Sequence, residues 1–255
     1  FRTGIALGDY TIDHHHKMNP GAPKIDFIKI RVPSYNIPMG SLIPKGSTHF
    51  IVAEKSIGVS NIVNGASRLQ PVVLGIGQAA GALAGTAILN DQNLQEVKIR
   101  KVQENLLEKK AYLMPFRDID ANHPHFISIQ KIGATGILKG FGVPYKWANQ
   151  TWFYPEREIS EFELVEGLRP LYSQYAQYWD ASGERLTLGR FLEIMKVVRP
   201  ELTEKDISLI WKNQNLSGTP AATTFLDRLS VAVLLDSILD PFSIPVDFNG
   251  LSTKP

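Results

Sequence analysis

The sequence predicts an α+β chain in two parts, a mixed part over residues 1–113 and a mainly α-helical part over residues 114–255. Three observations predict this division. Residues 69–89 form a long, uncharged, helix-like segment, and an amphipathic helix rich in lysine follows it. The composition then changes near Met114, after which amphipathic helices with N-terminal caps recur at intervals of about 25 to 40 residues.

The composition of the chain limits its domain number and its function class. The chain has 255 residues, of which 44% are apolar, so it can bury a sizeable core in one large domain or two. The net charge of +2 gives no basic surface for nucleic acid, and without cysteine the chain forms no disulfide. Because the first residue is Phe1 rather than Met, we expect a fragment of a longer protein.

Residues 69–89, LQPVVLGIGQAAGALAGTAIL, combine small and apolar residues without a charge. At 3.6 residues per turn, one face carries almost no side chains; it consists of Gly77, Ala80, Gly81, Ala84 and Gly85. A membrane span, a core helix packed closely on a sheet, and a helix start beside a cofactor all remain open. We expect no span, because only seven of residues 71–89 are Leu, Ile or Val.

Four motifs lead into this segment in order. They are Gly4–Lys17 (GIALGDYTIDHHHK), Tyr35–Lys45 (YNIPMGSLIPK), Phe50–Ala53 and Gly65–Pro71 (GASRLQP). Together with GQAAG at residues 77–81, they resemble the C-terminal part of a family of bacterial FAD-dependent oxidoreductases. The resemblance implies that residues 4–17 belong to a substrate-covering sheet and that residues 50–53 form the last strand of the FAD domain. It also implies that the GQAAG helix starts at the pyrimidine edge of the flavin.

This resemblance supplies the predicted cofactor-binding residues, which are Arg68, Gln70, Gly75, Gly77, Gln78, Ala79 and Gly81. A cation or amide at Arg68 and Gln70 would stabilise charge on the reduced flavin ring. Their alternative role is hydrogen bonding at the start of the helix.

The chain departs from a complete flavin enzyme in one important way. Such an enzyme holds the FAD pyrophosphate with a strand, a G-x-G-x-x-G turn and a helix, and this sequence has no such unit. The segment Glu54–Ser56 also replaces the glycine and polar or basic pair usual after the last strand. We therefore expect FAD in a longer parent protein and none in this chain alone, which we expect to be inactive.

The histidine run His14–His16 is the candidate for catalysis. Through the resemblance, His14 and His16 lie over the flavin and act on a substrate. In a strand these two side chains share a face and His15 points the other way. Polar positions on an exposed sheet face and transition-metal ligands are the alternatives, and we predict no metal site.

The second part begins after the helix at residues 97–110, whose buried edge carries Val102, Leu106 and Leu107. Residues 116–142 and 151–168 resemble an S-layer-homology repeat, with inward-facing Ile127, Ile129 and Ile132 in a first helix. A second helix begins at Ser160, which is placed as its N-cap. Its expected apolar stripe is Phe162, Val165, Leu168 and Leu171.

Two later segments, residues 185–198 and 223–239, have the same form, and residues 200–215 add a helix capped by Thr203. Stacked repeats of this kind share a core that one repeat cannot supply. We place Trp147, Trp152, Phe153 and Tyr154 on a loop, where they either stack on a sugar ring or pack against the repeat core.

The sequence therefore predicts the C-terminal part of an FAD-dependent oxidoreductase joined to an S-layer-homology-like module. The expected substrate is a small molecule or carbohydrate, the expected location is periplasmic or extracellular, and a cell-surface glycan is a possible partner of the module. The alternative is a non-catalytic surface protein that binds or processes polysaccharide, since some relatives carry polysaccharide-lyase labels.

Overall fold

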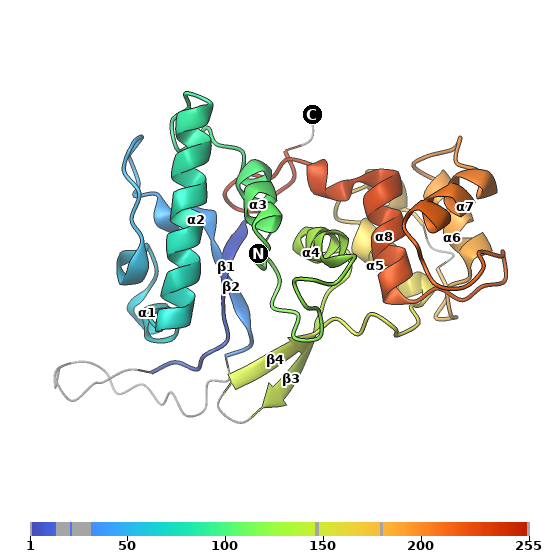
Figure 1. Cartoon of the computed structure of the whole chain (residues 1–255), viewed down its shortest axis with the longest axis horizontal. Coiled ribbons are helices and arrows are strands. Elements are labelled where there is room, and N and C mark those ends of the chain that lie inside the picture. The colour runs from blue at the N-terminus through green and yellow to red at the C-terminus, as the bar shows by residue number, and fades with distance from the viewer. Residues whose placement is uncertain (1, 14–20, 22–31, 146–147, 179–180, 254–255) are drawn as a thin grey trace. The chain divides into compact units, whose positions relative to one another are not determined.

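The computed structural model describes residues 2–13, 21, 32–145, 148–178 and 181–253 (Figure 1). The chain forms two compact units. Unit 1 contains residues 1–122, 141–152 and 245–255, and unit 2 contains residues 123–140 and 153–244. The chain thus enters unit 2 twice and returns to unit 1 twice. A separate helical domain over residues 114–255 stays a prediction.

In its described residues, unit 1 has two antiparallel two-stranded sheets, β1–β2 and β3–β4, and three α-helices. Its strands and helices are β1 (Gly4–Gly8), β2 (Tyr35–Pro38), α1 (Asn61–Ser67), α2 (Gln70–Leu89), α3 (Ile99–Glu108), β3 (Phe141–Tyr145) and β4 (Ala148–Trp152). Short 3-10 helices span Met39–Leu42 and Glu54–Ser56. The mixed α+β class is confirmed.

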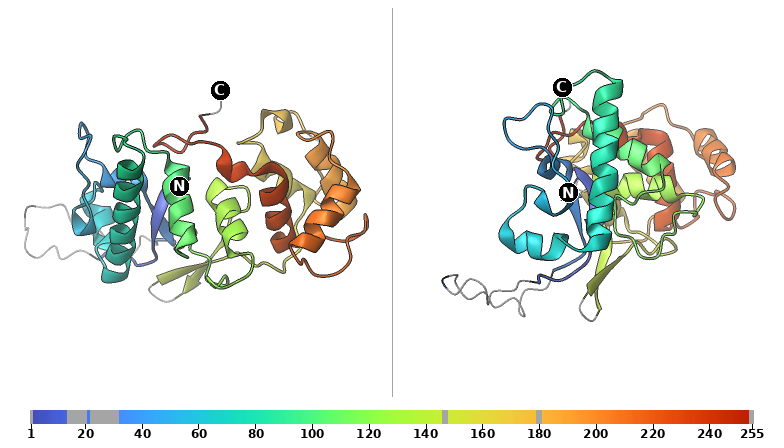
Figure 2. Two further views of the ribbon diagram at one scale, coloured as in Figure 1. Left: turned by 45° about the horizontal axis from the view of Figure 1, so that its top comes forward. Right: turned by 60° about the vertical axis from the view of Figure 1, so that its left-hand side comes forward.

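Helix α2 packs along β1, as both views of Figure 2 show. Its buried face carries Val72, Ile76, Ala79 and Leu83, spaced three and four residues apart as a helix requires. Gly75 faces β1, because a Cβ atom there would lie at ordinary contact distance, 3.5 Å, from the Cβ of Ala6. By length and composition α2 could cross a membrane, but this face packs as a core helix of a folded unit does.

The predicted strand at Phe50–Ala53 is wrong. In this segment Val52 N donates to Leu42 O at 2.9 Å, but no strand is assigned there. A strand needs a continuous ladder of backbone partners. Among the described residues no strand pairs with this segment, so the apolar pattern alone did not make a strand. The predicted helix before residue 110 is present as α3, with Val102, Leu106 and Leu107 buried.

Of the aromatic residues that we placed on a loop, Trp152 needs correction, Phe153 and Tyr154 lie outside strands and helices as expected, and Trp147 lies outside the described residues. Residues 148–152 form β4, which pairs antiparallel with β3 in a hairpin. Trp152 is half-buried in this strand and Phe153 is fully buried after it, whereas Tyr154 is exposed. Thr151 and Trp152 favour a strand, but the other residues of β4 do not, so the strand depends on its pairing with β3.

Unit 2 is helical in its described residues. Its elements are α4 (Phe126–Thr135), α5 (Glu161–Leu168), the 3-10 helix Ser173–Tyr175, α6 (Leu188–Lys196), α7 (Glu204–Asn213), α8 (Arg228–Leu239) and the 3-10 helix Pro241–Ser243. The predicted helix over residues 200–215 is α7, where Thr203 and Asp206 form a capping box.

Three segments that each precede a helix meet in a closed ring of backbone hydrogen bonds. Ile159 N donates to Leu226 O at 3.2 Å, Leu226 N to Leu186 O at 2.9 Å, and Leu186 N to Ile159 O at 2.8 Å. All three side chains are buried. The next residues, Ser160, Thr187 and Asp227, cap α5, α6 and α8 through their side chains. The three predicted helices therefore share one core, while the S-layer-homology identity stays a prediction.

Two residues of the predicted apolar stripes face solvent. Ile127 is 46% exposed and Phe162 is 54% exposed. In α4, Ile129 and Ile132 are buried, and a residue two positions before Ile129 lies on the opposite side of the helix. The buried stripe of α5 runs through Leu164, Val165 and Leu168 instead of through Phe162.

Arg228, at the start of α8, is the largest fully buried side chain of unit 2. Its guanidinium donates to Phe153 O at 2.7 Å, to Lys139 O at 2.6 Å and to the carboxylate of Glu163. It also lies 4.7 Å from the centre of the Phe153 ring. The buried charge is thus paired and hydrogen-bonded, as a charge inside a protein must be.

Candidate functional site

The candidate site lies where α1 ends and α2 begins. Arg68 is the C-cap residue of α1 and Leu69 is the N-cap residue of α2. No side chain caps the start of α2, and Pro71 contributes no N–H group to its first turn. The remaining first-turn N–H groups, at Gln70 and Val72, have no partner inside the helix. Such a helix start favours an electron-rich oxygen.

Arg68 connects the junction of α1 and α2 to the residues that follow β1. Its Nη2 atom donates to Asp13 O at 3.1 Å and to Asp13 Oδ2 at 3.3 Å. Asp13 N in turn donates to Gly65 O at 3.3 Å. Both side chains of the ion pair are about a third or more exposed, so the pair adds little stability. Its structural effect is to fix one end of the β1–β2 connection beside the start of α2.

The glycines of α2 leave its outer face open. A Cβ atom built on Gly77, Gly81 or Gly85 would meet nothing within 4 Å. The small-residue face predicted from the sequence is therefore present and uncovered by the described part of the chain.

The predicted cofactor-binding residues of α2 divide between two faces. Gln70, Gly77, Gln78 and Gly81 are exposed on the outer side. Gly75 and Ala79 face the sheet, and Ala79 is fully buried. The side of α2 that carries Gly75 and Ala79 packs against β1. Only the exposed residues on the opposite side of the helix are therefore accessible to a ligand.

Two large apolar side chains are exposed on the same face of α2. Leu74 is 76% exposed and Ile88 is 79% exposed. Further exposed apolar residues of unit 1 are Phe50, Ile62, Val63 and Leu89. Leu74 and Ile88 lie on the glycine side of α2, so a group that packed along this side of the helix would cover them.

The predicted catalytic residues His14 and His16 lie outside the described residues, so their role stays a prediction. Among the residues that the structure describes, no group of three or more His, Cys, Asp or Glu side chains could hold a metal ion.

Tyr35 is a residue of this unit that sequence reasoning missed. It pairs with Gly8 across the sheet, and a Cβ atom on Gly8 would lie 2.5 Å from its Cζ and Oη atoms. The ring therefore crosses the space that the glycine leaves. Burial, with a smaller contribution from Asp9, raises the pKa of Tyr35 to about 12, so the phenol stays neutral far above physiological pH. A glycine opposite an aromatic residue is the signal, but it requires knowledge of the strand register.

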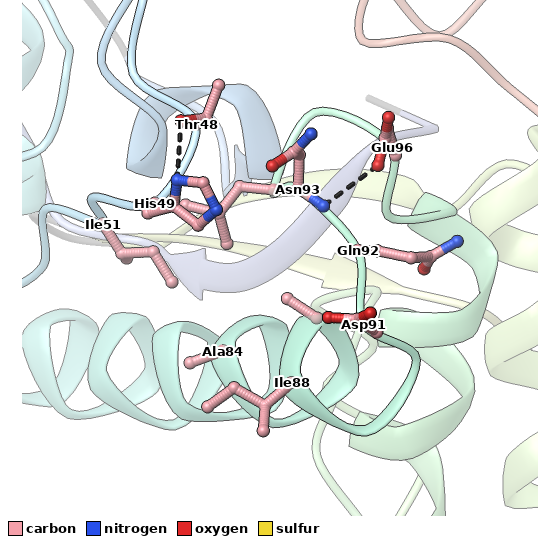
Figure 3. Close-up of a pocket in the computed structure, with 11 residues that line it drawn as sticks. Thr48, His49, Ile51, Ala84, Ile88, Asp91, Gln92, Asn93 and Glu96 are labelled. Atoms are coloured by element: carbon pink, nitrogen blue, oxygen red, sulfur yellow. Dashed lines mark hydrogen bonds between the residues drawn. The ribbon is translucent and has the colours of Figure 1, made fainter.

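A pocket of about 380 Å³ lies at the other end of α2 (Figure 3). It is lined by Thr48, His49, Ile51, Ala84, Ala87, Ile88, Asp91, Gln92, Asn93, Leu94 and Glu96. Thr48 Oγ1 lies 2.7 Å from His49 Nδ1, and Glu96 accepts from Asn93 N at 3.0 Å. Because α2 is about 30 Å long, this pocket is separate from the start of the helix, and no predicted site residue lines it.

Comparison with known proteins adds one finding. Residues 1–106 match the family model described as FAD dependent oxidoreductase. No curated protein and no solved structure matches the chain. The matched residues contain β1, β2 and the α1–α2 corner together with nearly all of α3. Residues 1–106 are therefore similar to an FAD-dependent oxidoreductase family region, and this match covers less than half of the chain.

Proposed function

We propose that residues 1–106 are the C-terminal part of an FAD-dependent oxidoreductase and that the start of α2 faces the flavin. One observation carries this proposal. In the region that matches the family, an uncapped helix start adjoins a glycine face on which no Cβ atom would meet a neighbour. A flat ring can approach such a backbone closely, whereas branched side chains would hold it away.

When bound, FAD supplies the acceptor for a hydride from a substrate carbon. The chain would stabilise negative charge at the pyrimidine edge with the first N–H groups of α2 and with Arg68 and Gln70. Gly77 and Gly81 would leave room for the ring. His14 and His16 are proposed to contact the substrate.

The pyrophosphate and ribose of FAD need a different unit. In this fold a G-x-G-x-x-G turn between a strand and a helix binds them, and the 255 residues contain no such unit. We therefore propose that the chain acts as part of a longer protein and does not bind FAD alone. The exposed Leu74 and Ile88 support this proposal, because a nucleotide-binding unit packed on α2 would cover them.

Two glycine variants test the position of the flavin in the longer protein. Gly77→Leu should lower the FAD content at least tenfold, whereas Gly85→Leu should retain FAD. Neither side chain would meet a neighbour within 4 Å of its Cβ, and the two sites lie about 12 Å apart along the helix. FAD content is read from the visible spectrum of the purified protein. Equal retention by both variants would place the flavin elsewhere.

The substrate and the cellular location are further parts of the proposal. We propose a carbohydrate as the substrate, and a periplasmic or extracellular location on the S-layer-homology resemblance of residues 114–255 alone. The second candidate function is a non-catalytic surface protein that binds or processes polysaccharide. It is favoured by the aromatic residues of the hairpin β3–β4, where Tyr145 is exposed and Trp152 is half-buried.

A polysaccharide pull-down with Trp152→Ala tests this second candidate. If the aromatic hairpin holds glycan, the variant should lose retention on cell-wall polysaccharide and keep its melting temperature. A lower melting temperature would instead assign Trp152 to packing.

A further inference from the structure

The pocket of about 380 Å³ at the end of α2 has no part in the proposed function (Figure 3). It lies within unit 1, between residues 48–51, the last turns of α2 and residues 91–96. Pockets that bind small molecules have volumes of about 300 to 1,000 Å³. This one is therefore large enough for a small organic ligand.

Hydrogen bonds join two walls of this pocket to each other. Leu94 N donates to Thr48 O at 3.0 Å, and the side-chain amide of Gln95 donates to Ser47 O at 2.8 Å. Both bonds connect the segment that follows α2 to the segment at residues 47–48. The folded chain itself holds these walls together, so the pocket is preformed.

The lining of the pocket is negatively charged. Among the described residues that line it, Asp91 and Glu96 carry carboxylates, and no lysine or arginine accompanies them. Neither carboxylate is in an ion pair within the described part of the chain. The pocket also adjoins the C-terminal end of α2, where the helix dipole places a partial negative charge. These charges favour a cation and disfavour an anion.

Hydrogen-bond acceptors lie on more than one wall. His49 comes from the segment before α2 and lies above the helix in Figure 3, while Asp91 lies at the end of the helix. Thr48 Oγ1 lies 2.7 Å from His49 Nδ1. When Nδ1 donates in this bond, Nε2 remains as an acceptor, and the side-chain amides of Gln92 and Asn93 offer two more. An ammonium group, with three donors, can use several of these acceptors at once.

Aliphatic side chains complete the lining. They belong to Ile51, Ala84, Ala87, Ile88 and Leu94. A bare metal ion would make no use of this surface, and no group of three His, Cys, Asp or Glu residues in the described ranges could hold one. A hydrocarbon chain with a cationic end group would instead bury apolar surface here while its charge lies beside the carboxylates.

We propose that this pocket binds a small aliphatic ammonium compound. Its ammonium group lies beside Asp91 and Glu96, and its hydrocarbon part lies against Ala84 and Ile88. The site is at the opposite end of α2 from the proposed flavin position, so it does not rest on the proposed function. It gives the region that resembles the oxidoreductase family a second ligand.

Binding is tested by NMR titration of the 255-residue chain with n-butylammonium, 1-butanol and butyrate, which are similar in size and differ in charge. The ammonium probe should shift the backbone amide signals of His49 and residues 91–93. It should bind about tenfold more tightly than the other two probes, because two carboxylates and a helix end act on its charge. Added salt should weaken its binding. Equal binding of the three probes, or no saturable shift at these residues, would overturn the proposal.

A charge variant tests the role of Asp91. Asp91→Asn removes the charge and keeps the backbone, because asparagine also adopts the positive φ of 48° at this position. The variant should bind n-butylammonium about threefold more weakly. Glu108→Gln is the matched control, since it removes an exposed carboxylate of unit 1 that does not line the pocket, and it should bind as the wild-type chain does. Equal affinity in the two variants would contradict the role of Asp91.

A filling variant tests the position of the hydrocarbon part. Ala84→Leu places a larger side chain in the lining and should abolish binding of n-butylammonium. Ala80→Leu makes the same change one turn earlier in α2, outside the lining, and should retain binding. Thermal melts show whether either variant loses its fold, and Asp91→Asn decides the proposal if Ala84→Leu does. Retained binding in a folded Ala84→Leu variant would overturn the proposal.

Discussion

At the scale of single residues, Arg228 shows how a charge can organise the core of unit 2. Its guanidinium bonds two backbone carbonyls from different segments and the carboxylate of Glu163. No sequence pattern indicated this, because an arginine at the first position of a helix reads as a surface residue. The contacts depend on Lys139 and Phe153, whose positions are set only by the tertiary fold.

Replacing Arg228 with alanine should lower the free energy of unfolding by about 3 kcal/mol, because it opens a cavity and leaves buried carbonyls without donors. Arg185→Ala is the control, since the Arg185–Glu158 pair is exposed and such pairs contribute less than about 1 kcal/mol. Urea denaturation measures both. Similar losses for the two variants would contradict the assigned role of Arg228.

Tyr35 gives a prediction on pH. Its pKa in the folded chain is about 12, above the ordinary value of about 10 in the unfolded chain. The unfolded state therefore loses its proton first, so the stabilisation is complete below about pH 10 and declines as the pH rises toward 12. Relative to Tyr35→Phe, the wild-type chain should lose up to about 2 kcal/mol over this range. If the free energy of unfolding changed with pH in the same way for both proteins, the pKa of the Tyr35 phenol would not be raised in the folded chain.

At the scale of elements, sequence reasoning succeeded where a helix carries its own signals. Ser160 and Thr203 were expected as caps and act as caps, and the buried edge of α3 was predicted from its spacing. It failed where the outcome depends on partners. Phe50–Ala53 has the composition of a strand but no neighbouring strand to share backbone hydrogen bonds with it. Residues 148–152 form a strand because they pair with β3.

The same reasoning applies to the candidate site. The open glycine face of α2 was predictable because helical periodicity is local, and the structure places Gly77 and Gly81 there. Periodicity alone did not assign Ala79 to the core, since the small-residue face and the sheet-facing side of this helix both carry alanine. The pairing of Tyr35 with Gly8 required the register of two strands 26 residues apart.

The ring of three backbone bonds gives a prediction at this scale. Leu226→Ala should destabilise unit 2 by about 2 to 5 kcal/mol, because its side chain is fully buried where the three repeated segments meet. Leu209→Ala, on the exposed side of α7, should cost less than about 0.5 kcal/mol. Thermal melts of the two variants compare them. Equal melting temperatures would mean that the residues of the hydrogen-bonded ring do not contribute to the stability of the unit 2 core.

At the scale of the whole molecule, the two units are each assembled from separate parts of the chain. A chain spanning residues 114–255 includes all of unit 2, with its ring and its capped helices. We expect it to fold alone and to show a cooperative, mainly helical melt by circular dichroism. A flat, noncooperative trace would show that unit 2 depends on residues 1–113.

The most direct test of the central claim is the flavin content of two purified proteins, the 255-residue chain and a longer one that includes a nucleotide-binding unit. The helix start of α2 offers donors to one edge of a flavin, but most of the affinity for FAD in this fold comes from pyrophosphate and ribose contacts that this chain lacks. The account predicts that the 255-residue chain is colourless and that the longer protein is yellow with one FAD per chain. Stoichiometric FAD in the 255-residue chain would contradict the proposal that a further unit is needed, and a colourless longer protein would contradict the oxidoreductase function itself.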